Sequence, residues 1–319
     1  MSLFLPEGVL VGHWTDRDGW TGCTAVLAPE GAVVACEVRG GGPGTRETDL
    51  LGPAASAPGA NAVVLSGGSV FGLAAADGVV RRLEEAGIGY RTRAGVVPLV
   101  ASAVVFDLAT GDPAARPGPE AGYAAATVAA REVERGSVGA GTGCTVGKLL
   151  GPGAWTKGGL GFAGRSLAGG GTVAALAVVN AFGEVLAEDG SILAGAWRDG
   201  AYRRTVDLLA RGESPSRPWR EATTLVCVLT DAALTKTQAW LVARAASAGV
   251  ARAVDPAATA VDGDVVYCVA TGRKDMDGLT LAAVAADVTA AAIRDGVRRA
   301  TSAPGCPSAA ERSAGEAGP

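Results

Sequence analysis

Short apolar stretches, rich in β-branched residues, recur along the chain, and most are bounded by Gly, Pro, Asp or Asn. Stretches with this length and these boundaries are typical of β-strands. The pattern predicts strands at residues 24–27, 32–38, 62–65, 103–106, 173–179, 225–229 and 265–269. Two hairpin turns are expected, one at Pro29-Glu30-Gly31 and one at Phe182-Gly183-Glu184.

Apolar residues at helical spacing predict helices at residues 69–86, 120–135, 235–248 and 279–300. The first carries an apolar stripe formed by Phe71, Ala75, Val79 and Leu83. Strands and helices do not alternate strictly, which favours an α+β layered fold over a doubly wound parallel sheet. Residues 301–319 are small, polar and interrupted by proline and glycine, and they predict a disordered tail.

Bulk composition narrows the classes of protein. The chain has 319 residues, 48% of them hydrophobic and 19% charged, which is enough for one large core or two modest domains. A formal net charge of −4 with no long basic run argues against a nucleic-acid partner. The apolar run at residues 172–180 is far shorter than the roughly 20 residues that cross a bilayer. We therefore expect a cytoplasmic protein with no membrane span.

The residues that usually hold metals or move protons are scarce. The six cysteines are widely spaced and form no CxxC pair, so no metal site or other cofactor is expected. His13 is the single histidine, and a Ser-His-Asp triad would depend on it alone. Proton transfer is therefore expected to use another group.

The segment at residues 221–231, EATTLVCVLTD, places two threonines at the start of a predicted strand. The β-propensity of threonine is one sufficient explanation. The other is an N-terminal nucleophile, created when the bond between Ala222 and Thr223 breaks. The new α-amino group, with a pKa of about 7.7–8.0, would then serve as the base for the Thr223 hydroxyl. A chain with one histidine would in this way make its own proton acceptor.

The junction ATTLVCVLTDAALTKTQ resembles the processing junction of the DmpA-type aminopeptidase family, which includes the nylon-oligomer endohydrolases and the β-aminopeptidases. Six further segments resemble the family in the family's order, and the likeness covers roughly residues 5–300. They are GGPGTRETDLL (41–51), LSGGSVFGLAAADGV (65–79), VPLVASAVVFDL (97–108), GAGTGCTVGKLLG (139–151), VVNAFGEV (178–185) and VDGDVVYCVATG (261–272).

This resemblance implies a four-layer αββα sandwich of the kind shared with the ornithine acetyltransferases. It implies one domain at residues 1–300, cut into a larger subunit, 1–222, and a smaller one, 223–319. The two subunits would stay together because each contributes strands and helices to one core. The resemblance also implies a homo-oligomer, often a tetramer of processed units.

The resemblance assigns Thr223 as the nucleophile and Lys148 as a lysine beside it. A neighbouring lysine would lower the pKa of the Thr223 amine and hydroxyl. Lys157 is a rival for this role, and a solvated surface position is the alternative for Lys148. Asn180 matches an asparagine near the nucleophile, whose amide would help hold an oxyanion. A turn-capping asparagine is the alternative.

The resemblance also assigns Asp262 and Asp264 as an acidic pair that orients the amine and the lysine. An ordinary Asp-Gly turn before a strand is the alternative. The pair places the chain nearer the nylon-oligomer hydrolase branch. Gly67, Gly68 and Ser69 open a predicted helix after a strand, where free backbone amides would bind a substrate carboxylate. A packed turn explains this corner equally well.

The sequence therefore predicts an autoprocessing hydrolase of small linear amides or short peptides, acting through an acyl-enzyme on Thr223. One alternative is an acyltransferase with the same nucleophile. Another is a non-catalytic homologue that never cleaves itself. Ala222 favours the last, since close relatives commonly have Asn or Gly before the nucleophile. An Ala–Thr junction also occurs in the ornithine acetyltransferases, so alanine does not exclude cleavage.

Overall fold

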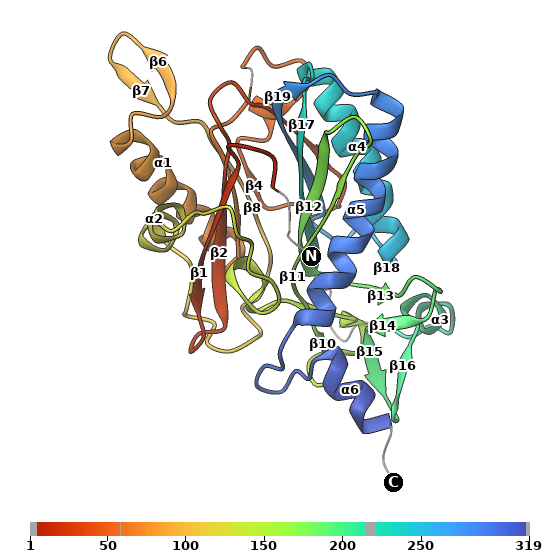
Figure 1. Cartoon of the computed structure of the whole chain (residues 1–319). Coiled ribbons are helices and arrows are strands. Elements are labelled where there is room, and N and C mark those ends of the chain that lie inside the picture. The colour runs from red at the N-terminus through yellow and green to blue at the C-terminus, as the bar shows by residue number, and fades with distance from the viewer. Residues whose placement is uncertain (1–4, 58, 215–220, 317–319) are drawn as a thin grey trace.

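Two five-stranded β-sheets lie face to face in the computed structural model, which describes residues 5–57, 59–214 and 221–316 (Figure 1). The first sheet has the order β1 (Leu10–Asp16), β2 (Thr21–Leu27), β5 (Ala62–Ser66), β8 (Val100–Val104), β4 (Thr45–Arg46). The second sheet has the order β11 (Gly159–Ser166), β12 (Thr172–Asn180), β17 (Thr223–Ala232), β19 (Val265–Lys274), β3 (Val33–Val38). Both are mixed, because β5 and β8 run parallel, as do β17 and β19.

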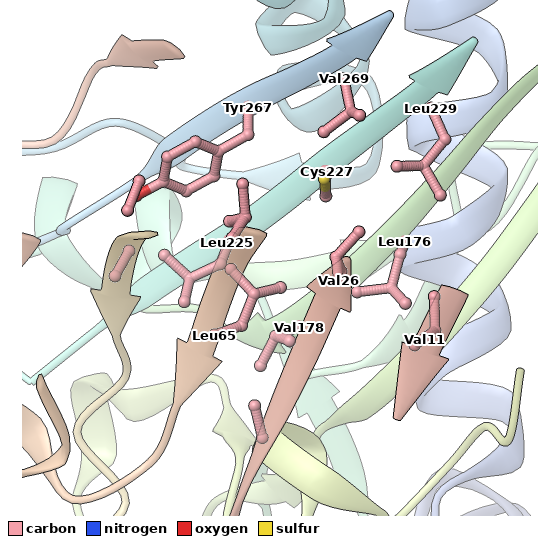
Figure 2. Close-up of a cluster of buried hydrophobic side chains, with 14 of the residues drawn as sticks. Val11, Val26, Leu65, Leu176, Val178, Leu225, Cys227, Leu229, Tyr267 and Val269 are labelled. Atoms are coloured by element: carbon pink, nitrogen blue, oxygen red, sulfur yellow. The ribbon is translucent and has the colours of Figure 1, made fainter. Parts of the chain in front are cut away.

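The main core fills the space between the sheets. Val26 and Leu65 of the first sheet are fully buried in one cluster with Leu176 and Leu225 of the second (Figure 2). Alternate residues of β17 point to opposite faces, so Val226 joins a different cluster under the helices. Because both faces of the central strands are covered, their middle residues, 173–179 in β12 and 225–229 in β17, are apolar at every position and not only at every second one.

Helices cover both outer faces of the pair of sheets. The helices α1 (Ala75–Glu85) and α2 (Pro119–Thr127) pack on the first sheet, and α4 (Lys236–Ala253) and α5 (Gly278–Arg299) pack on the second (Figure 1). The order helix, sheet, sheet, helix confirms the predicted four-layer αββα sandwich. No helix within the described residues combines the length and apolar character needed to span a bilayer.

Shorter elements complete the chain. They are η1 (Asp49–Leu51), η2 (Ser69–Ala74), β6 (Tyr90–Thr92), β7 (Gly95–Val97), η3 (Gly139–Gly141), β9 (Thr145–Val146), η4 (Lys148–Leu150), β10 (Thr156–Lys157), β13 (Glu184–Leu186), β14 (Ile192–Ala194), β15 (Ala196–Arg198), β16 (Ala201–Arg203), α3 (Thr205–Ala210), β18 (Val254–Asp255) and α6 (Ala309–Glu316).

The predicted helices at 235–248 and 279–300 are confirmed, and the other two need correction. The first begins as the 3-10 helix η2, whose three residues per turn rotate Phe71 outward to 50% exposure, whereas Val79 and Leu83 are buried. The second ends at Thr127 instead of residue 135. Beyond it, Ala130 exchanges two backbone hydrogen bonds with Val11 of the edge strand β1, so the sheet edge replaces the helix.

Both predicted hairpins are wrong. The turn at Pro29 forms, with the Ala32 amide donating to the Pro29 carbonyl at 3.1 Å, but it carries the chain from β2 in the first sheet to β3 in the second. Likewise, β12 lies in the second sheet, while β13 pairs with β14 and β18 in a separate small sheet. Strands that are apolar on both faces give the sequence no signal of which sheet each one joins.

The predicted disordered tail is also wrong for residues 301–316. Cys306 and Ala303 are buried against Trp155, and the Lys157 amide donates to the Pro307 carbonyl at 2.9 Å. Residues 309–316 form α6, and residues 317–319 lie outside the described part of the chain. The prediction failed because a segment poor in large apolar residues can still be ordered by small side chains that fit an existing surface.

The inter-sheet core predicts a matched pair of stability measurements. Leu65→Ala removes a fully buried side chain, whereas Leu279→Ala removes one that is 80% exposed. We expect the first to lower the free energy of unfolding by about 2–5 kcal/mol and the second by less than about 0.5 kcal/mol. Urea denaturation followed by circular dichroism measures both. Equal losses would contradict the described position of Leu65.

Candidate active site

Four of the predicted site residues meet at one end of the second sheet. Thr223, the first residue of β17, pairs directly with Asn180, the last residue of β12. Because β19 runs parallel to β17, Asp262 and Asp264, just before β19, lie at this same end. All four are buried, with Thr223 5% exposed and Asn180 fully covered.

Lys148 reaches this end of the sheet from the short helix η4. Its amide donates to the Phe182 carbonyl at 2.9 Å, and the Gly147 amide donates to the Gly183 carbonyl at 3.0 Å. Gly147 has a φ of +74°, and a Cβ there would lie 2.0 Å from the Ala196 nitrogen, so only glycine fits. Lys148 is 5% exposed, which rules out the solvated surface position that was its alternative.

The Lys148 ammonium and the Asn180 amide form one hydrogen-bond network. Lys148 Nζ donates to Asn180 Oδ1 at 2.9 Å and to the Glu221 carbonyl at 2.7 Å. Asn180 Nδ2 donates to the Phe106 carbonyl at 3.0 Å and to the same Glu221 carbonyl at 3.2 Å. The acceptor and donor sides of the amide are therefore both fixed, and Asn180 is a strand residue that caps no turn.

The peptide bond between Ala222 and Thr223 lies at the centre of the site. The Ala222 carbonyl accepts a hydrogen bond from the Thr223 hydroxyl at 2.6 Å and another from the Gly263 amide at 2.8 Å. A Cβ at Gly263 would lie 2.8 Å from Thr223 Oγ1, so this position needs glycine. Sequence reasoning missed Gly263, because a glycine between two aspartates looks like an ordinary turn.

The two carboxylates hold backbone around the site. Asp264 accepts from the Thr224 amide at 2.6 Å and from the Ala258 amide at 2.9 Å. Asp262 accepts from the amide and hydroxyl of Thr259 at 2.8 and 2.5 Å. Hydrogen bonds described for the pair thus fix the chain around Thr223, and none of them reaches Lys148. Of the two, Asp262 raises the pKa of Lys148 through its charge.

Burial shifts the titration of these groups. Burial, together with the charge of the neighbouring Asp262, raises the pKa of Asp264 to about 7. The pKa of Asp262 is also raised by burial, against the hydrogen bonds from Thr259. Burial lowers the pKa of Lys148 to about 8, although nearby acidic groups oppose this change. Groups that change charge near neutral pH are therefore concentrated beside Thr223.

Lys157, the rival lysine, has a different environment. Its side chain is fully buried, and Nζ donates to the carbonyls of Gly141, Cys144 and Gly158 at 3.1, 2.9 and 2.9 Å. Three carbonyl acceptors use the three N–H groups of the ammonium. Lys157 thus fastens three stretches of backbone, and of the two lysines it is Lys148 that contacts the residues around Thr223.

The corner at Gly67, Gly68 and Ser69 does not offer the free amides predicted there. Their amides donate to the Gly22 carbonyl at 2.8 Å, to Asp107 Oδ1 at 2.7 Å and to the Val105 carbonyl at 3.0 Å. The packed-turn alternative is therefore the one that the structure contains. Sequence reasoning missed Asp107, which is 3% exposed and also accepts from the Thr21 hydroxyl.

His13 lies on β1 of the first sheet, where Nδ1 is 2.9 Å from the Thr24 hydroxyl oxygen. Burial lowers the pKa of His13 to about 4, so this imidazole is neutral near pH 7. The described residues contain no group of His, Cys, Asp or Glu side chains arranged to hold a metal ion.

Solved structures share this architecture. A β-aminopeptidase from Burkholderia sp. superposes with a TM-score of 0.71 at 21% identity, over 98% of this chain and 91% of the other. An L-aminopeptidase D-Ala-esterase/amidase from Ochrobactrum anthropi, described as a new variant among the Ntn hydrolase fold, gives 0.70 at 19% identity, over 94% and 88%. The fold of this chain is therefore that variant of the Ntn hydrolase fold.

Sequence comparison identifies the family. Residues 7–309 match peptidase family S58, and the chain belongs to it, as a hydrolase of peptide or amide bonds. An uncharacterized aminopeptidase of Mycobacterium bovis is 42% identical over 281 residues, which cover 83% of this chain and 80% of the relative. A 6-aminohexanoate-oligomer endohydrolase of Agromyces sp. is 30% identical over 280 residues, covering 84% and 74%. The predicted resemblance to the DmpA-type family is confirmed.

The raised pKa of Asp264 predicts a pH dependence of stability. An aspartate in an unfolded chain has a pKa of about 3.9, so between that pH and about 7 the folded protein holds a proton that the unfolded chain has lost. The contribution of Asp264 to the free energy of unfolding is therefore fully present below about pH 4, and it is lost as the pH rises through about 7. The asparagine of the Asp264→Asn variant cannot ionise, so the free energy of unfolding of this variant should fall less with rising pH.

Urea midpoints at several pH values between 4.5 and 8 measure this slope. Asp18→Asn, at an exposed position, is the control and should keep the wild-type slope. If Asp264→Asn declines as steeply as the wild type, the carboxyl of Asp264 does not cause the dependence.

Proposed function

We propose that the chain cleaves itself between Ala222 and Thr223, and that the new amino-terminal Thr223 then hydrolyses small linear amides or short peptides. The contact of the Thr223 hydroxyl with the carbonyl of Ala222 carries this proposal. Oγ1 lies 2.6 Å from the Ala222 carbonyl oxygen, which also accepts from the Gly263 amide. The nucleophile, the bond to be cut and a donor for the developing charge are thus already together in the uncut chain.

Self-cleavage begins when Thr223 Oγ attacks the carbonyl carbon of Ala222. The C–N bond breaks, the Ala222 acyl group becomes an ester on Oγ, and the departing nitrogen of Thr223 takes up the proton that the hydroxyl has lost. Water then hydrolyses the ester and leaves a carboxylate on Ala222. The Gly263 N–H stabilises the negative charge that develops on the carbonyl oxygen. The bonds that change at position 222 are backbone bonds, so alanine in place of the Asn or Gly of close relatives does not prevent this step.

Turnover uses the amine that cleavage has produced. The α-amine of Thr223 takes the hydroxyl proton, Oγ attacks the substrate carbonyl, and the leaving amine departs with a proton. Water then releases the acid from the acyl-enzyme. The Lys148 cation lowers the pKa of the Thr223 amine by like-charge repulsion. The Gly263 amide holds the oxyanion, because the N–H groups of Asn180 Nδ2 donate to the Phe106 and Glu221 carbonyls instead. Asp262 and Asp264 keep the backbone around Thr223 in place.

Both products of the cut would remain in one particle. Strands β3, β11 and β12 come from residues 1–222, whereas β17 and β19 come from residues 223–319, and all five form the second sheet. Separating the subunits would break the pairing of β12 with β17 and expose the inter-sheet core.

The first prediction for this function concerns the nucleophile. We expect purified wild-type protein to give two polypeptides, the smaller beginning Thr-Thr-Leu-Val, and Thr223→Ala to give one uncut chain without amidase activity. Thr224→Ala is the matched control, because Thr224 is equally buried and its hydroxyl makes no described hydrogen bond. Intact mass and amino-terminal sequencing decide the result. An uncut wild-type chain that still hydrolyses amides would refute the proposal.

The second prediction separates the two buried lysines. Lys148→Met should slow self-cleavage at least about ten-fold, because the cation that stabilises negative charge developing on the Thr223 hydroxyl oxygen is lost. It should slow amide turnover as much, because the like-charge effect on the new Thr223 amine is lost as well. Lys157→Met should instead lower the free energy of unfolding by several kcal/mol, at about 1–3 kcal/mol for each carbonyl left without a donor. Cleavage rates and urea midpoints are measured for both variants. If Lys148→Met keeps wild-type rates, the lysine has no part in the chemistry.

A further inference from the structure

The uncut chain carries its own acyl-side peptide in the candidate site. Ala222, the residue whose carbonyl is to be cut, is only 3% exposed. It packs in an apolar cluster with the buried side chains of Leu149, Phe182 and Leu208, and the partly buried Leu150 and Val261 pack against this cluster. We call these five residues the acyl pocket. Because self-cleavage and turnover use the same nucleophile, the substrate's acyl group would bind in the position that Ala222 occupies in the uncut chain.

One residue earlier, the site holds a carbonyl group. The Glu221 carbonyl accepts from both Lys148 Nζ, at 2.7 Å, and Asn180 Nδ2, at 3.2 Å. Lys148 Nζ and Asn180 Nδ2 both donate here, so this point suits the oxygen of an amide. An acyl group that begins with another amide, as in the interior of a peptide, would satisfy both donors.

We propose that the processed enzyme binds the acyl side of its substrate as it binds Glu221 and Ala222, with an alanine-sized side chain in the acyl pocket and an amide carbonyl on Lys148 and Asn180. The enzyme would then cleave after small residues inside a chain or behind a blocked amino terminus, and not only at free amino termini. This inference rests on the proposed function, because it needs Thr223 to serve both reactions.

The acyl pocket should accept only small side chains, because the residues that form its walls are held in place by other contacts. Leu149 belongs to η4, which is held by the backbone bond of Lys148 to Phe182, and Phe182 is itself the second wall. Leu208 lies on α3, where the Thr205 amide donates to the buried Glu184 carboxylate. A leucine in place of Ala222 would have to displace these walls. A hydrophobic pocket typically rejects an oversized group by about ten-fold or more.

The test within the chain uses the junction itself. Ala222→Gly should cleave at a rate close to the wild type, whereas Ala222→Leu should cleave at least about ten-fold more slowly. Freshly translated protein sampled over time on denaturing gels gives both rates. Rapid cleavage of Ala222→Leu would overturn the size limit.

The test on added substrates uses processed wild-type enzyme with the p-nitroanilides of acetyl-alanine, acetyl-leucine and alanine. We expect the acetyl-alanine compound to be hydrolysed, with a kcat/KM at least about ten-fold above that of acetyl-leucine. Leu208→Ala should narrow this ratio by enlarging the pocket. Leu209→Ala, whose side chain is 41% exposed on the same helix, should leave it unchanged.

The outcomes distinguish this inference from the proposed function. If no terminus at Thr223 forms, the proposed function fails. If processed enzyme cleaves the alanine anilide but not its acetylated form, or cleaves both acetylated compounds equally, only the acyl-pocket inference is overturned. Should Leu208→Ala fail to fold by circular dichroism, the wild-type comparison of acetyl-alanine with acetyl-leucine decides the question.

Discussion

The antiparallel register between β12 and β17 is the constraint on which the rest of the site depends. It sets Asn180 directly opposite Thr223, at the end of the sheet where the parallel strand β19 also begins. A slip of one residue would turn Thr223 to the other face and remove it from Asn180. The inter-sheet core prevents this slip, because it would also move Leu225 and Cys227 out of that core.

The site also contains a buried positive charge. Lys148 is buried beside Thr223, and its ammonium group donates to the Asn180 amide and the Glu221 carbonyl. An unpaired charge in this position would be very costly. The Glu221 carbonyl is one of the acceptors in this network. Under the proposed cleavage, departure of the acyl-side peptide would leave donors that a substrate carbonyl could fill.

The contrast between Lys148 and Lys157 shows how position decides the role of a residue type. Both are buried lysines from neighbouring segments of the chain. Lys157 is surrounded by three carbonyls and can only hold backbone. Lys148 has a side-chain amide and the carbonyl of Glu221 as its partners, so its charge lies where the proposed reaction changes bonds. The same reasoning separates Asp107, which accepts from the Gly68 amide, from Asp264, which accepts from the Thr224 amide at the start of β17.

Much of the secondary structure could be predicted from local patterns. The long helices α4 and α5 and the central strands β12, β17 and β19 have strong periodicity or long apolar runs, and burial enforces both. The two hairpins were predicted wrongly, because central strands covered on both faces carry no alternation that assigns them to a sheet. The end of α2 and the order of residues 301–316 depend on an edge strand and on Trp155, and neither contact is visible in the local sequence.

By itself, the sequence determined the layered fold class, the family and the residues that meet around Thr223, because family motifs preserve chemistry in a fixed order. Only the tertiary structure decided which lysine contacts the junction, that the amides at Gly67–Ser69 are already occupied, and that Gly263 donates to the Ala222 carbonyl. It also decided what encloses the side chain of Ala222. Local sequence encodes periodicity and burial, whereas contacts between segments far apart in the chain are fixed by sheet register and packing.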